Sequence, residues 1–542
     1  MRLLTAAVVA AFALPGGADA ARFAVGVSPG TSPEALARTL EARTDGRTSV
    51  IGPFAVELRA RSDRGVHGLS GVDYVERLSA RRRVAFVPTD PFFGPRQWYI
   101  PAVRGFDAWP RQPSWLTPTK VAIIDSGIDG DHPEFRFGRI AAANTFVGGS
   151  ALKDSQGHGT FVAGVIAARL DGLGMAGLAF PAQLLIAKVV RADGTVPLDA
   201  EARAIRWAVD RGARVINLSL GGVRNPFDPV GDGYSPLEAG AVRYAVRKGA
   251  VVVAAVGNGD QAPDQPWRYA SYPAALPHVL GVSALERDGS VPMFSNRDSV
   301  FNDIAAPGDE LFSTLPRALT AQRPLCVEQG YSECGPPEFR RPQGTSFAAA
   351  IVSAGAALAR SAWPELRPEQ ITTMLERSAL DQMAATGCRR CAEGRDALTG
   401  WGRLDVAGVV NWPRSHPVAD RYETNDEAGA GAKLVRGRSA RIRARIDYWD
   451  DQNDVYAVRL KRNQRLSLRL FGEGMEVDLA IWRPGTRRVD DVRSLSGSPV
   501  DQSKRRGAKD TLHFRPKRAG RYYVQVKITE PGSGPYRLDL VR

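Results

Sequence analysis

The feature that most constrains the fold is an alternation of short apolar runs with helix-length segments in the middle of the chain. The runs include Val121–Ile124, Val215–Leu218 and Val251–Ala255, and the segments 198–210 and 236–248 lie between them. These segments have the length and the amphipathic pattern of helices. Strands joined by helical crossovers form parallel sheets that are covered on both faces. The sequence therefore predicts an α/β domain built on a doubly wound parallel sheet.

Four polar residues stand where such a sheet would hold a ligand. Asp125 directly follows the run 121–124, and Asn258 follows the run that begins at Val251. His158 and Ser346 instead open predicted helices, and glycines flank all four residues. Ligands of open parallel sheets bind at the carboxyl ends of the strands. We therefore expect these side chains to meet at one edge of the sheet.

The four residue types are those of nucleophilic acyl transfer. A serine hydroxyl is a poor nucleophile until a base accepts its proton, which suits an imidazole with a pKa near neutrality. A buried carboxylate holds that imidazole in the correct tautomer. We assign Ser346 as nucleophile, His158 as general base and Asp125 as the orienting acid. The amide of Asn258 and the main-chain N–H of Ser346 are the predicted oxyanion donors.

The flanking residues resemble those of the subtilisin-like serine peptidases, the subtilases, over about residues 97–410. Residues 121–129, 157–164 and 344–350 are similar to the three catalytic signatures of that family, in its order Asp, His, Ser. Residues 254–259 are similar to its oxyanion motif. The resemblance implies an endopeptidase that hydrolyses polypeptides through an acyl-enzyme on Ser346. It implies no required cofactor; calcium, which many members bind, has no D-x-D-x-D-G loop here and is left unplaced.

The resemblance also assigns a substrate-binding edge. In the family, one segment pairs with the substrate backbone and walls the primary side-chain pocket, and a second segment lies opposite. The matching residues of this chain are Ser219, Leu220, Gly221 and Gly222 on the first, with Ala254, Ala255 and Gly257 on the second. The side-chain preference at the scissile bond is left open.

Two other functions use the same residues. The first is a catalytically inactive subtilase fold that serves as a binding module, although no catalytic position is replaced in this chain. The second is another acyl transfer, peptide ligation or ester hydrolysis, on the same site. Taken singly, Asp125, His158 and Ser346 could each be structural, as a turn cap, a core histidine and a helix cap. Their joint order and flanks favour catalysis.

The first 20 residues have the pattern of a secretory signal peptide. Arg2 precedes the apolar run 3–14, and Ala18-Asp19-Ala20 supplies small residues for cleavage. The run is shorter than the ~20 apolar residues that span a bilayer, which disfavours a membrane anchor. We therefore expect a secreted, extracellular protein; the periplasm is the alternative destination.

Residues 21–90 alternate short strands and an amphipathic helix, which predicts a small α+β unit. The resemblance makes this unit an inhibitory propeptide that blocks its own catalytic domain, with Val84–Pro88 as its final strand. The catalytic domain is then 91–412. We expect self-cleavage between Phe86 and Arg96; the alternative is an external protease acting at the basic run 81–83.

The chain is long enough for more than one hydrophobic core, since it has 542 residues of which 44% are apolar. After a linker at 413–420, residues 421–542 alternate apolar and polar positions and predict a β-sandwich. This region resembles the bacterial pre-peptidase C-terminal domain. It holds 27 Lys and Arg against 16 Asp and Glu. The excess suits an anionic surface or a merely solvated one, and no nucleic-acid motif accompanies it. We expect a monomer.

Four cysteines are present, Cys326, Cys334, Cys388 and Cys391. An even number in an exported protein predicts two disulfides, for which three pairings are possible. We favour the local pairs, the first two residues with each other and the last two with each other. The alternative is a zinc site, which is disfavoured because only one C-x-x-C spacing occurs.

Overall fold

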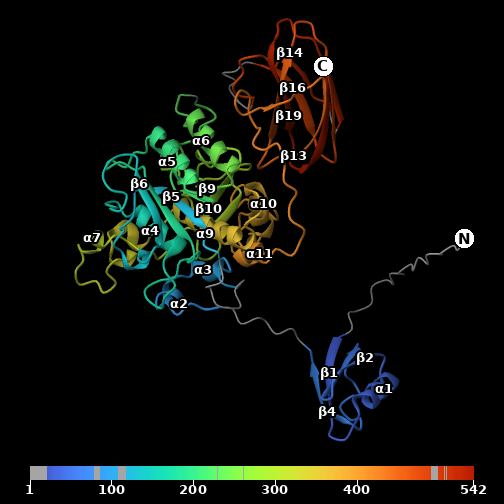
Figure 1. The fold of residues 1–542 in the computed structure, drawn as a ribbon. Coiled ribbons are helices and arrows are strands. Elements are labelled where there is room, and N and C mark those ends of the chain that lie inside the picture. The colour runs from blue at the N-terminus through green and yellow to red at the C-terminus, as the bar shows by residue number, and fades with distance from the viewer. Residues whose placement is uncertain are drawn as a thin grey trace, which may run out of the picture. The chain divides into compact units, whose positions relative to one another are not determined.

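The structure is a computed structural model of the 542-residue chain. It describes residues 21–78, 86–107, 117–228, 230–260, 262–489, 498–505, 507 and 509–542. The predicted signal peptide and residues 81–85 lie outside these ranges. Two compact units are separated at Val84–Ala85 (Figure 1).

The N-terminal unit is an antiparallel sheet with one helix. Its elements are β1 (Ala21–Val27), α1 (Pro33–Arg43), β2 (Arg47–Gly52), β3 (Ala55–Ala60) and β4 (Val72–Arg77), and the strand order is β2-β3-β1-β4. Ser32 caps α1 by accepting a hydrogen bond from the main-chain N–H of Ala35. Leu36 and Leu40 of that helix are buried against the sheet. The α+β prediction is therefore confirmed.

The predicted final strand of this unit is wrong in its described part. The last strand of the sheet is β4, and Phe86 and Val87 belong to no strand. Val84 and Ala85 lie outside the described residues. Short apolar runs are ambiguous because an extended connection that packs on a core has the same composition as a strand; Phe86 indeed packs against the core of the catalytic domain.

The catalytic domain is built on a seven-stranded sheet in the order β11-β10-β9-β8-β5-β7-β6, in which all neighbours pair in parallel. The strands are β5 (Lys120–Asp125), β6 (Ile140–Thr145), β7 (Gln183–Lys188), β8 (Val215–Leu218), β9 (Val251–Ala255), β10 (Val279–Leu285) and β11 (Ile304–Pro307). The α/β prediction with a doubly wound parallel sheet is confirmed.

Ten helices and three 3-10 turns of the described residues accompany this sheet. The helices are α2 (Phe93–Arg96), α3 (Tyr99–Ala102), α4 (His158–Ala167), α5 (Leu198–Asp210), α6 (Pro236–Arg247), α7 (Arg317–Thr320), α8 (Pro337–Arg340), α9 (Thr345–Ala362), α10 (Pro368–Ser378) and α11 (Val406–Val410). The turns are η2 (Pro133–Phe135), η3 (Ser332–Cys334) and η4 (Ala384–Thr386).

Two hydrophobic cores lie on opposite faces of the sheet. One joins the strands to α4, α9 and α10, and the other joins them to α5 and α6 (Figure 1). Within the described residues, α9 is the one helix long and apolar enough to cross a membrane, but 83% of it is buried in the protein. Its apolar composition reflects its place at the centre of the first core.

The C-terminal module consists of two sheets, as the alternating pattern predicts. Their orders are β12-β14-β19-β16-β17 and β13-β20-β15-β18. The strands are β12 (Lys433–Leu434), β13 (Ser439–Asp447), β14 (Asn453–Leu460), β15 (Leu466–Gly472), β16 (Val477–Trp482), β17 (Asp501–Ser503), β18 (Lys509–Phe514), β19 (Gly520–Ile528) and β20 (Ser533–Val541). The inward side chains of both sheets form one core, which includes Tyr456, Leu468, Val524 and Leu538.

Candidate active site

The carboxyl edge of the parallel sheet carries the predicted catalytic residues. Asp125 is the last residue of β5, and His158 is the first residue of α4. Gly157 precedes this helix with a φ of 90°, and a Cβ there would lie 2.9 Å from the side chains of Leu315 and Leu319. A left-handed φ in so tight a place requires glycine. The turn into α4 therefore fixes where the imidazole enters the site.

Asp125 and His158 form a buried hydrogen-bonded pair. The imidazole Nδ1 lies 2.8 Å from one carboxylate oxygen of Asp125 and 3.0 Å from the other. The Asp125 side chain is 3% exposed and that of His158 is 30% exposed. Desolvation alone would lower the pKa of His158, but the charge of Asp125 and its hydrogen bond outweigh burial and raise this pKa above its ordinary value. The pair is arranged to stabilise an imidazolium.

Asp154 organises this pair, although the sequence analysis did not single it out. One of its carboxylate oxygens accepts hydrogen bonds from the Ser126 hydroxyl (2.9 Å) and the Gly157 N–H (2.9 Å). The other accepts from the main-chain N–H and the hydroxyl of Thr160. It thereby ties the residue after β5 to the first turn of α4. Asp154 lies three residues before Gly157 and is not itself at the N-cap position, so the capping rule does not single it out.

Ser346 is the second residue of α9, at the positive end of an 18-residue helix. Its hydroxyl donates to the main-chain carbonyl oxygen of Ser219 at 3.2 Å, and the Ser219 hydroxyl donates to the main-chain oxygen of Ser346 at 2.7 Å. The ring of Phe347, the next residue, lies 5.5 Å from the His158 ring between centroids. The Ser346 hydroxyl therefore hydrogen-bonds to the segment that is predicted to bind the substrate.

Asn258 is held so that its amide nitrogen stays available as a donor. Its side-chain oxygen accepts hydrogen bonds from the main-chain N–H and the hydroxyl of Thr345, both at 2.9 Å. Thr345 is fully buried, and its hydroxyl also accepts from the N–H of Gly257 at 3.2 Å. Because the oxygen is occupied by donors, the NH₂ group points away from Thr345. This orientation suits an oxyanion donor, and Thr345 is a positioning residue that the sequence analysis missed.

Comparison with known proteins agrees with this geometry. The sequence model of the Subtilase family matches residues 117–402, just over half of the 542-residue chain. The chain belongs to the subtilase family. Thermitase of Thermoactinomyces vulgaris is 36% identical over 239 residues, which cover 44% of this chain and 78% of thermitase. The major intracellular serine protease of Bacillus subtilis (strain 168) is 34% identical over 251 residues, 45% of this chain and 68% of that protein. Subtilisin DY of Bacillus licheniformis is 32% identical over 261 residues, 48% of this chain and 83% of subtilisin DY.

These matches make the chain a subtilisin-like serine protease, so its substrates are polypeptides. The family match stops at residue 402. The N-terminal unit and the C-terminal module are thus additional regions that it does not identify.

A cavity of about 170 Å³ is lined by Ser346 and Asn258 and is the candidate primary pocket. Six of its lining residues were predicted at the site, namely Leu220, Gly221, Ala255, Gly257, Asn258 and Ser346. The remaining wall includes Val223, Ser271 and Asn296. The amide of Asn296 donates to the carbonyl of Val256 (2.9 Å) and to the Ser271 hydroxyl (3.3 Å), which fixes the polar end of the pocket.

Three other predicted substrate-binding residues lie outside this cavity. Ser219 contacts the nucleophile, as described above, and Gly222 pairs with Tyr272 through two main-chain hydrogen bonds of 2.9 Å each. Ala254 is fully buried in the core behind β9. The strand period explains the last case, because alternate side chains of β9 point to opposite faces of the sheet.

Both pairs of cysteines are disulfide-bonded. Cys326 pairs with Cys334 and Cys388 with Cys391, at Cα–Cα distances of 5.6 and 5.4 Å. The first bond closes a loop that ends with η3, before α8 and α9. The four sulfur atoms are therefore not available as zinc ligands in this structure.

Proposed function

We propose that the chain is a secreted endopeptidase zymogen that hydrolyses peptide bonds through an acyl-enzyme on Ser346. The observation that carries this proposal is that the hydrogen-bonded pair of Asp125 and His158 lies next to the start of α9, whose Ser346 lines one pocket together with Asn258. His158 removes the proton of the Ser346 hydroxyl as the oxygen attacks the scissile carbonyl carbon. The resulting oxyanion receives hydrogen bonds from the Asn258 amide and the Ser346 N–H. His158 then donates its proton to the leaving amine, and water repeats the sequence to release the acid.

The N-terminal unit supports the zymogen part of the proposal. Residues 21–78 form a sheet and helix with a core of their own, which includes Val25, Leu40 and Val56. A unit that folds around its own core can act as an inhibitor in cis before removal. We propose self-cleavage between Phe86 and Arg96, where residues 86–90 are extended and carry no regular structure. Export would remove residues 1–20 first.

The experiment compares the secreted wild-type protein with Ser346→Ala on casein and on a mixed peptide library, with the N-terminus of each determined. We expect wild type to cut internal peptide bonds and to begin after residue 85, while Ser346→Ala is inert and begins at Ala21. If both proteins are correctly processed and inert, the fold is a binding module. If wild type releases ligated peptides or cleaves esters only, the site performs another acyl transfer.

The C-terminal module is proposed to contact anionic surfaces through its excess of Lys and Arg. Exposed cations attract such surfaces over roughly a Debye length, about 8 Å at physiological ionic strength. Cosedimentation of inert Ser346→Ala with anionic and neutral vesicles tests this proposal. Equal binding to both would contradict it.

A further inference from the structure

The catalytic domain and the C-terminal module are joined by buried polar contacts. The Arg247 guanidinium donates to the main-chain oxygen and the hydroxyl of Thr424, at 2.7 and 3.0 Å. The His278 imidazole lies 2.8 Å from Asp426 and 3.2 Å from Glu423. These contacts fix the start of the module on the catalytic domain. The loop between β13 and β14 is thereby held over the edge of the catalytic sheet.

Three carboxylates from distant parts of the chain converge under that loop. Asp303 directly precedes β11, Glu376 lies in the last turn of α10, and Asp450 lies between β13 and β14. One carboxylate oxygen of each lies within 4.8 Å of the others. Asp303 and Glu376 are each 2% exposed. Two domains therefore supply one compact set of oxygen ligands.

Protein groups alone do not satisfy all the carboxylate oxygens of this set, as Glu376 shows. Its Oε1 atom is buried and has no hydrogen-bond partner. Asp303 is better satisfied, because it accepts hydrogen bonds from the Gly281 N–H (2.8 Å) and from Arg395 (3.3 Å). A buried carboxylate oxygen without a partner is costly and points to a ligand that would complete it.

The charged groups around these three carboxylates also point to a missing cation. Asp447 adds a fourth carboxylate at the edge, and the nearby cations are Arg395 and Arg377, the latter 3.9 Å from Asp447. Both guanidinium groups also lie over the Trp401 ring. With all four carboxylates ionised, the two guanidinium groups would leave two negative charges uncompensated in a buried place. One divalent cation would neutralise them.

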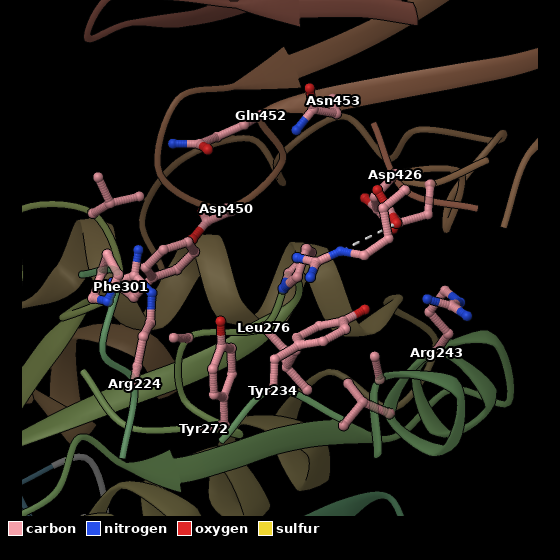
Figure 2. Close-up of a pocket in the computed structure, with 18 of the residues that line it drawn as sticks. Arg224, Tyr234, Arg243, Tyr272, Leu276, Phe301, Asp426, Asp450, Gln452 and Asn453 are labelled. Carbon is pink, nitrogen blue, oxygen red and sulfur yellow. Dashed lines mark ion pairs between the residues drawn. The ribbon is translucent and has the colours of Figure 1, made fainter. Parts of the chain in front are cut away.

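One member of the set borders an open cavity. Asp450 lines a cavity of about 530 Å³ between the module and the catalytic domain. In Figure 2 the module loop that carries Asp450, Gln452 and Asn453 faces Arg224 and Tyr272 of the catalytic domain across this cavity. A cavity of this volume has room for water, and water there can supply further ligands to an ion at Asp450.

We propose that Asp303, Glu376 and Asp450 bind one divalent cation of the calcium class, and that this ion fastens the C-terminal module to the catalytic domain. Oxygens within 4.8 Å of one another can share an ion at the ~2.3–2.6 Å distances that Ca²⁺ prefers. The site is independent of catalysis, so it can be tested on the inert full-length Ser346→Ala protein.

The first measurement is bound Ca²⁺ per chain by equilibrium dialysis and metal analysis. We expect Glu376→Gln, made in the Ser346→Ala background, to lose one equivalent. The result is the difference in bound Ca²⁺ between the variant and its parent, not the total bound Ca²⁺ per chain. The total could include a second site, because another set of three close carboxylates, Glu423, Asp451 and Asp454, lies within the module. Asp539→Asn is the matched control. It changes a carboxylate on β20 that pairs with Arg441 of β13, and it should lose no bound Ca²⁺.

The second measurement uses Tb³⁺ as a luminescent probe. Trp401 and Trp449 meet edge to face beside the site, with ring centroids 5.0 Å apart, and should sensitise the bound ion. We expect Ca²⁺ to displace the signal and Glu376→Gln to reduce it. Asp450→Asn, on the partly exposed loop, should do the same and serves if the buried substitution prevents folding.

The third measurement tests whether the ion holds the C-terminal module on the catalytic domain. Trypsin cleavage at the exposed Arg414 of the linker should be at least ~10-fold slower in Ca²⁺ than in chelator, and this protection should disappear in Glu376→Gln and Asp450→Asn. Unchanged Ca²⁺ stoichiometry in both variants would overturn the proposal. In that case the Glu376 and Asp450 carboxyl groups share a proton instead, as their mutual hydrogen bond allows.

Discussion

The hydrogen bond between the Thr345 hydroxyl and the Asn258 side chain gives a sharp test of how this subtilase holds its oxyanion donor. Asn258→Ala removes the donor itself, which typically costs ~10²–10³ in kcat. Thr345→Val leaves Asn258 in place but removes one of the two 2.9 Å hydrogen bonds that orient its amide. A neutral hydrogen bond contributes about 0.5–1.5 kcal/mol, so we expect kcat to fall by roughly 2- to 12-fold.

The double variant separates orientation from general damage. If Thr345 acts through Asn258, Thr345→Val should cost almost nothing once Asn258 is alanine, because there is no amide left to orient. Thr345→Ser keeps the hydroxyl and should stay near wild type. KM should change little in every case, since the oxyanion hydrogen bond strengthens only in the transition state.

The assay is the hydrolysis of a chromogenic peptide amide by proteins whose N-termini and melting temperatures match. An equal loss from Thr345→Val in both backgrounds would refute the orienting role. It would point instead to the second hydrogen bond of this hydroxyl, which it accepts from the Gly257 N–H. An unchanged kcat in Thr345→Val would show that the main-chain N–H of Thr345 suffices.

Three further predictions follow from the same geometry. His158 acts as a base only when it is neutral, so kcat/KM should fall as the pH drops through its pKa, which lies above 6.5. Asp125→Asn removes the charge that raises this pKa, so the acid limb of the pH profile should move to lower pH while kcat falls ~10⁴-fold. An acid limb that stays in place would contradict the assignment. A Cβ at residue 159 would lie 2.2 Å from the carbonyl oxygen of Gly127, so Gly159→Ala should displace the catalytic motifs and lower kcat/KM at least ~100-fold. The control is Gly240→Ala, which lies in open space on α6. It should keep full activity and raise the free energy of urea unfolding by about 0.5–1 kcal/mol. Cys326 and Cys334 are 8 positions apart in the sequence, so replacing both by Ser in the Ser346→Ala protein should lower the free energy of urea unfolding by about 2–3 kcal/mol. An unchanged unfolding midpoint would show that this loop is already ordered without its disulfide.

Local sequence patterns predicted much of the fold and placed the candidate catalytic residues at the ends of its strands and helices. The predicted helix at 198–210 is α5, and the run 121–124 lies within β5. Such predictions succeed because the side-chain period and the position at a strand end are properties of neighbouring residues. Phe86 and Val87 show the limit of this reasoning, because an apolar run that packs as an extended connection has the composition of a strand.

The positioning residues could not be found in the same way. Asp154 and Thr345 act through hydrogen bonds to residues of other motifs, and a sequence pattern does not state which donor meets which acceptor. Only the packed structure shows that the oxygen of Asn258 is occupied by Thr345 and that its nitrogen is left as the donor.

By itself, then, the sequence determined the chemistry of this subtilase, because a nucleophile, a base and an acid are fixed by residue type and recognised by their immediate flanks. The tertiary structure decided the geometry that joins distant segments. Asp303, Glu376 and Asp450 have ordinary neighbours in the sequence and become a set of ligands only when a strand, a helix and a module loop are packed together. Burial creates their shared charge deficit, and burial is a property of the folded chain.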